Sequence, residues 1–194
     1  MPVDYTGMRL LSVFLLFAVF AQARAAEPVA PARPTHWALA VNHTTLENCY
    51  RVSDELYRCE QPDKKDIAAL QALGIHSILN LRQYHTDPKA FEQAGFTLLL
   101  HRIDTDDITV DDLVAALRLF RTAPRPVMVH CWHGSDRTGS VVAAYRIVFQ
   151  NWTPAAALAE LRHGDYGYHE KWFPNIITLL EKIDADALRK RVLE

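Results

Sequence analysis

The sequence predicts an α/β protein in which helices flank both faces of a central, mainly parallel sheet, preceded by a short N-terminal hairpin. Apolar strand-like runs alternate along the chain with helical patterns, and strands separated by helices require crossover connections between parallel neighbours. The helical segments carry recognisable start and stop residues, which distinguish them from the strands. With 194 residues, of which 49% are hydrophobic, the chain can bury one substantial core but is short for two.

The first elements are a hairpin and a capped helix. Residues 49–59, CYRVSDELYRC, alternate apolar and polar side chains on both sides of a turn-prone Ser53-Asp54 pair. The segment DKKDIAALQALG predicts a helix that begins at Asp63, a good N-cap residue, and ends at Gly74. Three segments continue the alternation: a buried strand at residues 76–82, a helical piece at 88–94 and a strand at 96–103.

The second half supplies the central strand and a run of helices. Thr109 and Asp112 form a capping-box pattern, which favours a sharp helix start for TVDDLVAALRLF. The apolar PVMVH, residues 126–130, is the candidate for the central strand. The segments after the following loop are helical: residues 138–149, residues 153–164 with Thr153 as the cap, and residues 172–183.

The N-terminus has the pattern of a secretory signal peptide. Leu10–Ala21 is an uninterrupted apolar run with Arg9 before it and small residues after it. Such a run is short for a membrane span, so residues 1–25 are predicted to be removed on secretion. Met8 is an alternative start, and an uncleaved membrane anchor is the alternative fate of the segment.

The remaining chain divides into a linker and one catalytic domain. Residues 26–46 begin with an Ala- and Pro-rich stretch and are interpreted as a linker and lead-in, and residues 47–194 as the domain. The formal net charge is −2, with no basic stripe, so no nucleic-acid partner is expected. A monomer without stable membrane association is expected after the signal peptide is cleaved.

The stretch VHCWHGSDRTGS, residues 129–140, contains the candidate catalytic residues. It places Cys131 and Arg137 between the central strand and a helix, and Gly134 allows the connecting loop to curl with its backbone N–H groups inward. Such a loop suits a phosphate dianion and also stabilises a thiolate, so Cys131 is expected to be nucleophilic at neutral pH. Arg137 offers a planar fork that binds two phosphate oxygens together.

HCWHGSDRTG resembles the H-C-x5-R-[S/T] signature of cysteine-dependent protein tyrosine and dual-specificity phosphatases. The blocks YRVSDELYRCEQP, GIHSILNLR and YRIVFQNWTPAAALAELRHGDYGYH are similar to those of small exported bacterial members, so the resemblance covers most of residues 47–180. It implies a dual-specificity-phosphatase-like fold, a periplasmic location and no cofactor. It also implies hydrolysis of phosphate monoesters through a cysteinyl-phosphate intermediate.

The resemblance also assigns the residues of the site. Cys131 is the expected nucleophile, His130 is expected to orient the loop through hydrogen bonds, and Thr138 to steady the thiolate as it leaves. The phosphate-binding loop comprises six residues: Trp132, His133, Gly134, Ser135, Asp136 and Arg137.

The general acid is expected on the loop that follows the strand at 96–103. Related enzymes keep an aspartate there, and this chain offers Asp104, Asp106 and Asp107. Alignment of the following helix favours Asp106, while the Asp-Thr pair at Asp104 resembles other dual-specificity enzymes and keeps that residue open.

Other interpretations of the same residues remain. A zinc site formed by His130, Cys131 and His133 fits a tetrahedral geometry poorly because two ligands are adjacent in sequence, so no metal is expected. A buried structural cysteine, a sulfurtransferase of the rhodanese class and a non-catalytic phosphopeptide-binding module are the further alternatives.

The expected substrate is a phosphorylated protein or a small phosphomonoester. Family members that act on polyphosphorylated inositols often carry lysines in the loop, whereas Asp136 repels extra negative charge. A cysteine phytase or inositol-phosphate phosphatase is the alternative. Candidates for the mouth of the site are Arg51, Arg58, Arg82, His101 and Arg102, and the aromatic stretch DYGYHEKW suits either a substrate wall or helix packing.

The two remaining cysteines are predicted to form a disulfide. Cys49 and Cys59 are equidistant from Asp54, so they fall opposite one another in the predicted hairpin. An oxidising compartment would preserve the bridge and leave Cys131 as the free thiol. Two unpaired cysteines are the alternative.

Overall fold

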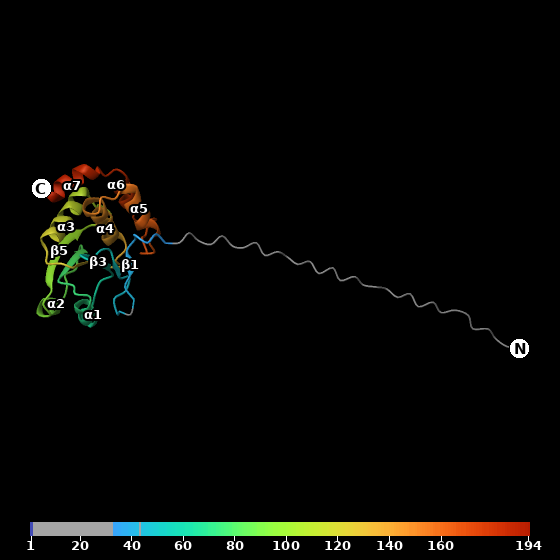
Figure 1. The fold of residues 1–194 in the computed structure, drawn as a ribbon, viewed down its shortest axis with the longest axis horizontal. Coiled ribbons are helices and arrows are strands. Elements are labelled where there is room, and N and C mark those ends of the chain that lie inside the picture. Colours follow the sequence, from blue (N-terminus) through green and yellow to red (C-terminus); the bar gives the residue numbers. More distant parts are fainter. Residues whose placement is uncertain (2–32, 43) are drawn as a thin grey trace. The chain divides into compact units, whose positions relative to one another are not determined.

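The folded unit begins earlier than the sequence predicts. The computed structural model describes residues 33–42 and 44–194 together with Met1 (Figure 1), so the predicted signal peptide lies outside the described residues. The compact unit starts at Arg33 and not at residue 47. The Arg33 guanidinium donates hydrogen bonds to the Gly164 carbonyl at 2.7 Å and the Tyr166 hydroxyl at 2.9 Å, and Ala38 is buried. The predicted linker therefore packs onto the domain from Arg33 onward.

The sheet has six strands in the order β1-β2-β3-β6-β4-β5. β3, β6, β4 and β5 pair in parallel, while β1 and β2 add antiparallel pairs at one edge, so the predicted mainly parallel sheet is confirmed. β6 lies between β3 and β4, the central position predicted for PVMVH. The bounds are β1 (Leu39–Ala40), β2 (Tyr50–Arg51), β3 (Leu56–Cys59), β4 (Ser77–Arg82), β5 (Thr97–Ile103) and β6 (Val127–His130).

Helices cover both faces of the sheet, as predicted (Figure 1). Met128 of β6 packs with Leu70 and Phe91 in the smaller core under α1 and α2, whereas Val127 and Val129 point into the larger core under α3 to α7. The bounds are α1 (Ile67–Ala72) after a 3₁₀ turn (Lys64–Asp66), α2 (Ala90–Gln93), α3 (Val110–Thr122), α4 (Asp136–Phe149), α5 (Pro154–His163), α6 (Pro174–Glu181) and α7 (Ala185–Leu193).

The predicted helix starts are confirmed by their caps. Asp63 and Thr109 each form a complete capping box, and the Thr153 hydroxyl accepts a hydrogen bond from the Ala156 N–H. Gly74 ends the first helix with a φ of +69°, a conformation that favours glycine. The helix predicted from residue 138 begins two residues earlier, so Asp136 and Arg137 lie in the first turn of α4.

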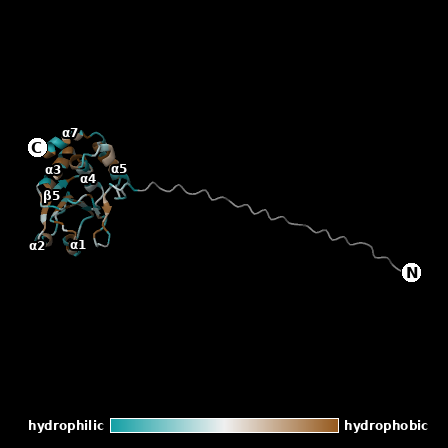
Figure 2. Cartoon of the chain, in the orientation of Figure 1, coloured by the Kyte–Doolittle hydropathy of each residue, from teal (hydrophilic) through white to brown (hydrophobic). Residues whose placement is uncertain are grey.

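α3 is amphipathic and buries one face, whereas α4 is buried on nearly all sides. Figure 2 shows brown and teal side by side along α3, whose Leu113, Leu117 and Phe120 are buried. Within the described ranges, no helix combines the length and the apolar character that crossing a membrane requires.

The hairpin has the predicted register. Tyr50 pairs with Arg58 and Arg51 with Tyr57, which places Cys49 opposite Cys59. The two cysteines form a disulfide with a Cα–Cα distance of 4.1 Å, and Cys131 is a free cysteine.

We expect one titratable thiol in the denatured, non-reduced protein. The Cys49–Cys59 bridge closes a loop with a sequence separation of 10. In the chain-entropy treatment, a bridge of this size adds about 2–3 kcal/mol to the free energy of unfolding. The double variant Cys49→Ala, Cys59→Ala should lose that amount in denaturant unfolding, with catalysis retained. Three titratable thiols in the wild type would show that the hairpin is unbridged.

Candidate active site

The loop from Cys131 to Arg137 joins the end of β6 to the start of α4, as predicted. Cys131 is only 2% exposed, and it follows directly on the central strand. Gly134 has a φ of +69°, and a Cβ atom there would overlap the carbonyl oxygen of Cys59 at the end of β3. The loop therefore needs glycine at this position to curl against the neighbouring strand.

The carbonyl groups of the loop are bound from outside by side chains. Arg58 Nη2 donates to the Gly134 carbonyl at 2.6 Å, and Asn48 Nδ2 donates to the His133 carbonyl at 2.6 Å. Because the C=O and N–H of a peptide unit point in opposite directions, these bonds turn the N–H groups of Gly134 and Ser135 toward the inside of the loop. The loop is thus held as an anion-binding cradle at the N-terminus of α4.

Arg58 lies beneath this loop and not at the mouth of the site, which corrects the expectation. It is 1% exposed, and its guanidinium carbon lies 3.8 Å from the centre of the Tyr166 ring. Burial lowers the pKa of Arg58 to about 10. The hydrogen bond to Gly134 and the aromatic face compensate for burying the charge.

His130 contacts the first carbonyl of the loop, and its other partner is Asp87. The Nδ1 atom of His130 lies 3.0 Å from the Cys131 carbonyl, and its Nε2 atom lies 3.2 Å from Asp87 Oδ2. Burial would raise the pKa of Asp87, but its hydrogen bond with His130 and the His130 charge, together with Gln61, hold the pKa below its usual range. A buried carboxylate thus fixes the ring that binds the first carbonyl of the loop.

Asp87→Asn should weaken both the fold and the loop. Asp87 also accepts hydrogen bonds from the side-chain amides of Gln61 and Asn80. An asparagine cannot accept all of these, so we expect a loss of about 1–3 kcal/mol in the free energy of unfolding at neutral pH.

The loss should depend on pH in a defined direction. Because the folded pKa of Asp87 is lowered, its carboxylate contributes stability above the ordinary aspartate pKa of about 4, and the contribution disappears as the pH falls through the folded pKa. Chemical denaturation of the wild type and Asp87→Asn across pH 3 to 7 measures this. Parallel curves for the two proteins would exclude a stabilising Asp87 carboxylate.

Two atoms of the signature are buried without protein partners. Within residues 33–42 and 44–194, the buried side-chain polar atoms that lack a hydrogen bond are Arg58 Nε, Arg137 Nε and Thr138 Oγ1. Arg137 is otherwise held only by a long contact of 3.5 Å from Nη1 to the Ile103 carbonyl. Buried polar groups are normally satisfied, so a free guanidinium donor and hydroxyl beside Cys131 indicate a site for a bound anion.

The loop after β5 distinguishes its aspartates. Asp104 accepts hydrogen bonds from Gln83 Nε2 at 2.9 Å and from the Asp106 N–H at 3.2 Å, so its carboxylate shapes the loop. Asn175 Nδ2 binds the carbonyls of Thr105 and Asp106. The carboxylates of Asp106 and Asp107 are both exposed and have no hydrogen-bond partner in the part of the chain that is described, so Asp106 is available as the acid.

Arg82 is the basic side chain at the mouth. Its guanidinium carbon lies 4.0 Å from the centre of the Trp132 ring, and burial and the Arg137 charge lower the pKa of Arg82. Three other candidates bind elsewhere: Arg51 pairs with Asp54, His101 with Asp112, and Arg102 with the Gln83 carbonyl. The aromatic stretch serves both packing and the surface. Tyr166 is buried under the loop, whereas Trp172 is exposed beside His169.

The sequence analysis missed Asp87 and Asn175. Asp87 precedes Pro88 and a helical segment, so its local pattern suggests only a helix start. Asn175 lies in the first turn of α6 with no neighbouring polar motif. Both act through contacts across the fold, 43 and about 70 residues away along the chain, and no local signal reveals such contacts.

Comparison with known proteins decides the family. The model of the tyrosine phosphatase family matches residues 44–187. The chain belongs to the tyrosine phosphatase family. The dual specificity protein phosphatase TpbA of Pseudomonas aeruginosa is 33% identical over 191 residues, which covers 97% of this chain and 85% of that protein.

Two solved structures share the fold of this chain. A crystal structure of a cysteine-to-serine variant of P. aeruginosa TpbA in complex with phosphotyrosine superposes with a TM-score of 0.75 at 32% identity, covering 84% of this chain and 99% of that one. The catalytic core of the phosphatase SIW14 from S. cerevisiae has a TM-score of 0.64 at 23% identity, with 74% and 90% covered, and shows the shared fold. The chain is a cysteine-dependent phosphatase of the dual-specificity type, as the resemblance implies.

Proposed function

We propose that this phosphatase hydrolyses phosphotyrosine in proteins, with Cys131 as the nucleophile, Arg137 as the phosphate clamp and Asp106 as the general acid. The observation that carries the proposal is the unpartnered, buried Nε of Arg137 in the same loop as the buried, free Cys131. The phosphotyrosine complex of TpbA supports the substrate class, since that protein matches this chain over 84% of its length.

In the first step, the Cys131 thiolate attacks phosphorus and the bond to the leaving oxygen breaks. The phosphoryl oxygens are bound by the inward N–H groups of the loop and by the Arg137 fork, which stabilise the charge of the transition state. Asp106 donates its proton to the departing oxygen, so the product leaves as an alcohol or phenol.

In the second step, water attacks the phosphocysteine and the sulfur–phosphorus bond breaks. Asp106, now ionised, accepts the proton of the water, and phosphate is released. The Thr138 hydroxyl, buried and without a partner, donates a hydrogen bond to the returning thiolate. Cys131 is thereby restored as the thiolate.

The choice of substrate rests on the charge and shape of the loop. Trp132 presents a ring that is 52% exposed next to Cys131. The Asp136 carboxylate is bound to His169 on the outer side of the loop, so it acts against polyanionic substrates through its charge alone. An exposed ring at the mouth suits a substrate whose phosphate is attached to an aromatic side chain.

A matched panel of substrates tests the proposal. Phosphotyrosine, phosphoserine and phosphothreonine peptides of one sequence are compared with inositol phosphates by phosphate release, with Cys131→Ser as the blank. The highest kcat/KM is expected for phosphotyrosine peptides. A preference for inositol phosphates would instead favour an activity like that of the inositol diphosphatase DSP5 of Arabidopsis thaliana, which is 33% identical over 74% of this chain and 72% of its own length.

Asp106→Asn should slow the enzyme most on substrates with poor leaving groups. The amide has no proton to donate, so we expect a loss of about 10²–10⁴-fold in kcat for a phosphotyrosine peptide. The loss should be smaller for para-nitrophenyl phosphate, because nitrophenolate leaves without protonation. Asp104→Asn is the matched control, and the assignment is wrong if that variant shows the substrate-dependent loss and Asp106→Asn does not.

We also propose that the enzyme is exported to the periplasm. The apolar run Leu10–Ala21, the Arg before it and the small residues after it support a cleaved signal peptide. Mass analysis of the protein recovered from the periplasm of a bacterial host is expected to give a chain that begins after Ala25. Recovery of the uncleaved chain in the membrane fraction would favour an anchor.

A further inference from the structure

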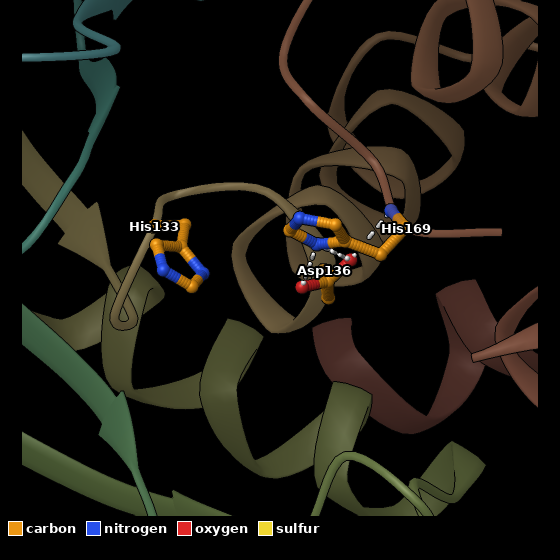
Figure 3. Close-up of side chains that lie close together, drawn as sticks. All are labelled: His133, Asp136 and His169. Atoms are coloured by element: carbon orange, nitrogen blue, oxygen red, sulfur yellow. Dashed lines mark hydrogen bonds and ion pairs between the residues drawn. The ribbon is translucent and has the colours of Figure 1, made fainter. Parts of the chain in front are cut away.

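Two histidines and one aspartate meet on the outer side of the phosphate-binding loop. The ligand atoms of His133, Asp136 and His169 all lie within 4.8 Å of one another (Figure 3). His133 and Asp136 come from the loop and the first turn of α4, and His169 comes from the segment between α5 and α6. Within the described residues, this is the one group of three or more such side chains with that spacing.

We propose that His133, Asp136 and His169 bind a divalent transition-metal cation of the zinc class. Imidazole nitrogens and a carboxylate oxygen are ordinary zinc ligands, and three protein ligands leave a fourth position for water. This set shares only His133 with the zinc site considered from the sequence, because His130 is buried with both ring nitrogens bound and Cys131 is not required.

The pair His169–Asp136 already has the spacing of two ligands on one metal. The Nδ1 atom of His169 lies 3.0 Å from Asp136 Oδ2, close to the separation of about 3.3 Å between neighbouring ligands at tetrahedral zinc. The cation takes the place of the hydrogen bond between these two atoms, and the neutral His169 ring then carries its proton on Nε2.

The surrounding residues hold these side chains in place. Asp136 is 6% exposed and accepts a second hydrogen bond from the His169 backbone N–H at 3.0 Å. The His169 ring stacks on Trp172 with centroids 5.0 Å apart and planes 9° apart. The His133 ring lies 5.5 Å from that of His169, so only the exposed His133 has to turn to complete the site.

The local charge allows a cation despite the adjacent helix N-terminus. Among the described residues, Asp136 forms no ion pair with a lysine or arginine, and the one side chain with a titratable nitrogen that it contacts is His169. His133 and His169 line a hollow of about 300 Å³ that is also lined by Glu60 and Asp165. The Asp136 carboxylate and the nearby Glu60 oppose the positive end of α4, whereas the Asp165 carboxylate pairs with Arg33. The open hollow gives a hydrated ion access.

Zinc titration in the Cys131→Ser background tests the proposal without catalysis. The serine removes the thiolate, which is the competing zinc ligand, and the chain carries no histidine tag. Calorimetry with zinc chloride is expected to show one saturable site per chain. X-ray absorption should show only nitrogen and oxygen ligands near 2.0–2.2 Å.

Ligand variants decide which residues form the site. His133→Gln and His169→Gln, each in the Cys131→Ser background, should weaken zinc binding about tenfold or more. His163→Gln is the matched control because this histidine is exposed on the last turn of α5 and lies outside the cluster, so its affinity should equal that of the parent. Thermal unfolding without metal establishes that each variant is folded.

Three outcomes would overturn the proposal. The first is the absence of saturable binding in Cys131→Ser when the wild type binds zinc, which would assign the metal to the thiolate. The second is unchanged affinity in both folded ligand variants, and the third is a sulfur ligand in the absorption spectrum. Because none of these measurements uses turnover, the result is independent of the proposed substrate.

Discussion

Replacement of Cys131 by serine is expected to abolish turnover and leave the binding of phosphate esters intact. The serine hydroxyl is far less acidic than a thiol, so it supplies no nucleophile at neutral pH. The side chain is nearly isosteric in a 2% exposed position, so the loop should keep its shape. We expect a rate at least about 10⁴-fold below that of the wild type, the scale of loss when a catalytic nucleophile is removed.

Two measurements on the same protein separate catalysis from binding. Phosphate release from para-nitrophenyl phosphate gives the rate, and calorimetry with a phosphotyrosine peptide gives the dissociation constant. A dissociation constant within a few-fold of the wild-type KM is expected. Undiminished turnover would refute the cysteinyl-phosphate mechanism, whereas loss of binding with a normal unfolding curve would show that the thiol itself holds the loop in shape.

The sequence predicted the elements whose signals are local. The helix starts at Asp63, Thr109 and Thr153 depend on hydrogen bonds between residues no more than three apart, and all three caps are present. β1 was missed because its two exposed residues show no alternation and owe their pairing to β2, about ten residues on. α7 was not predicted as a separate helix, and its two buried residues find their core only in the folded chain.

The catalytic loop could also be predicted from the sequence, because its signal is local. Cys131, Gly134 and Arg137 lie within seven consecutive residues, so their spacing is visible before folding. The side chains that hold the loop come from elsewhere. Asp87 reaches His130 from 43 residues away, and Arg58 reaches Gly134 from 76 residues away.

Arg58 was expected at the exposed mouth of the site, but it is buried. A guanidinium is normally placed at the surface, and only the fold provides the Gly134 carbonyl and the Tyr166 ring that make its burial tolerable. The same limit applies to the aspartates after β5. Their order along the chain does not reveal that Asp104 is bound by Gln83, while the Asp106 carboxylate has no partner among the described residues.

Arg137→Lys is expected to be nearly as damaging as loss of the nucleophile. The guanidinium presents two parallel N–H groups to two phosphoryl oxygens, and a lysine ammonium cannot reproduce this geometry. Among residues 33–42 and 44–194, the buried Nε of Arg137 has no hydrogen-bond partner, so this donor is open to the substrate. We expect kcat/KM to fall about 10³-fold, as when a charge-stabilising donor or arginine is removed from a phosphoryl-transfer site.

The division of that loss between kcat and KM identifies what the arginine does. If the fork binds the planar, charge-spread transition state better than the ground-state ester, most of the loss appears in kcat, and orthovanadate inhibition weakens in parallel. Arg118→Lys is the matched control, because Arg118 is exposed on α3 and donates only to the Arg191 carbonyl, so its kinetics should match the wild type. Activity of Arg137→Lys within a few-fold of the wild type would mean that charge alone suffices. The loop N–H groups would then be the main source of transition-state stabilisation.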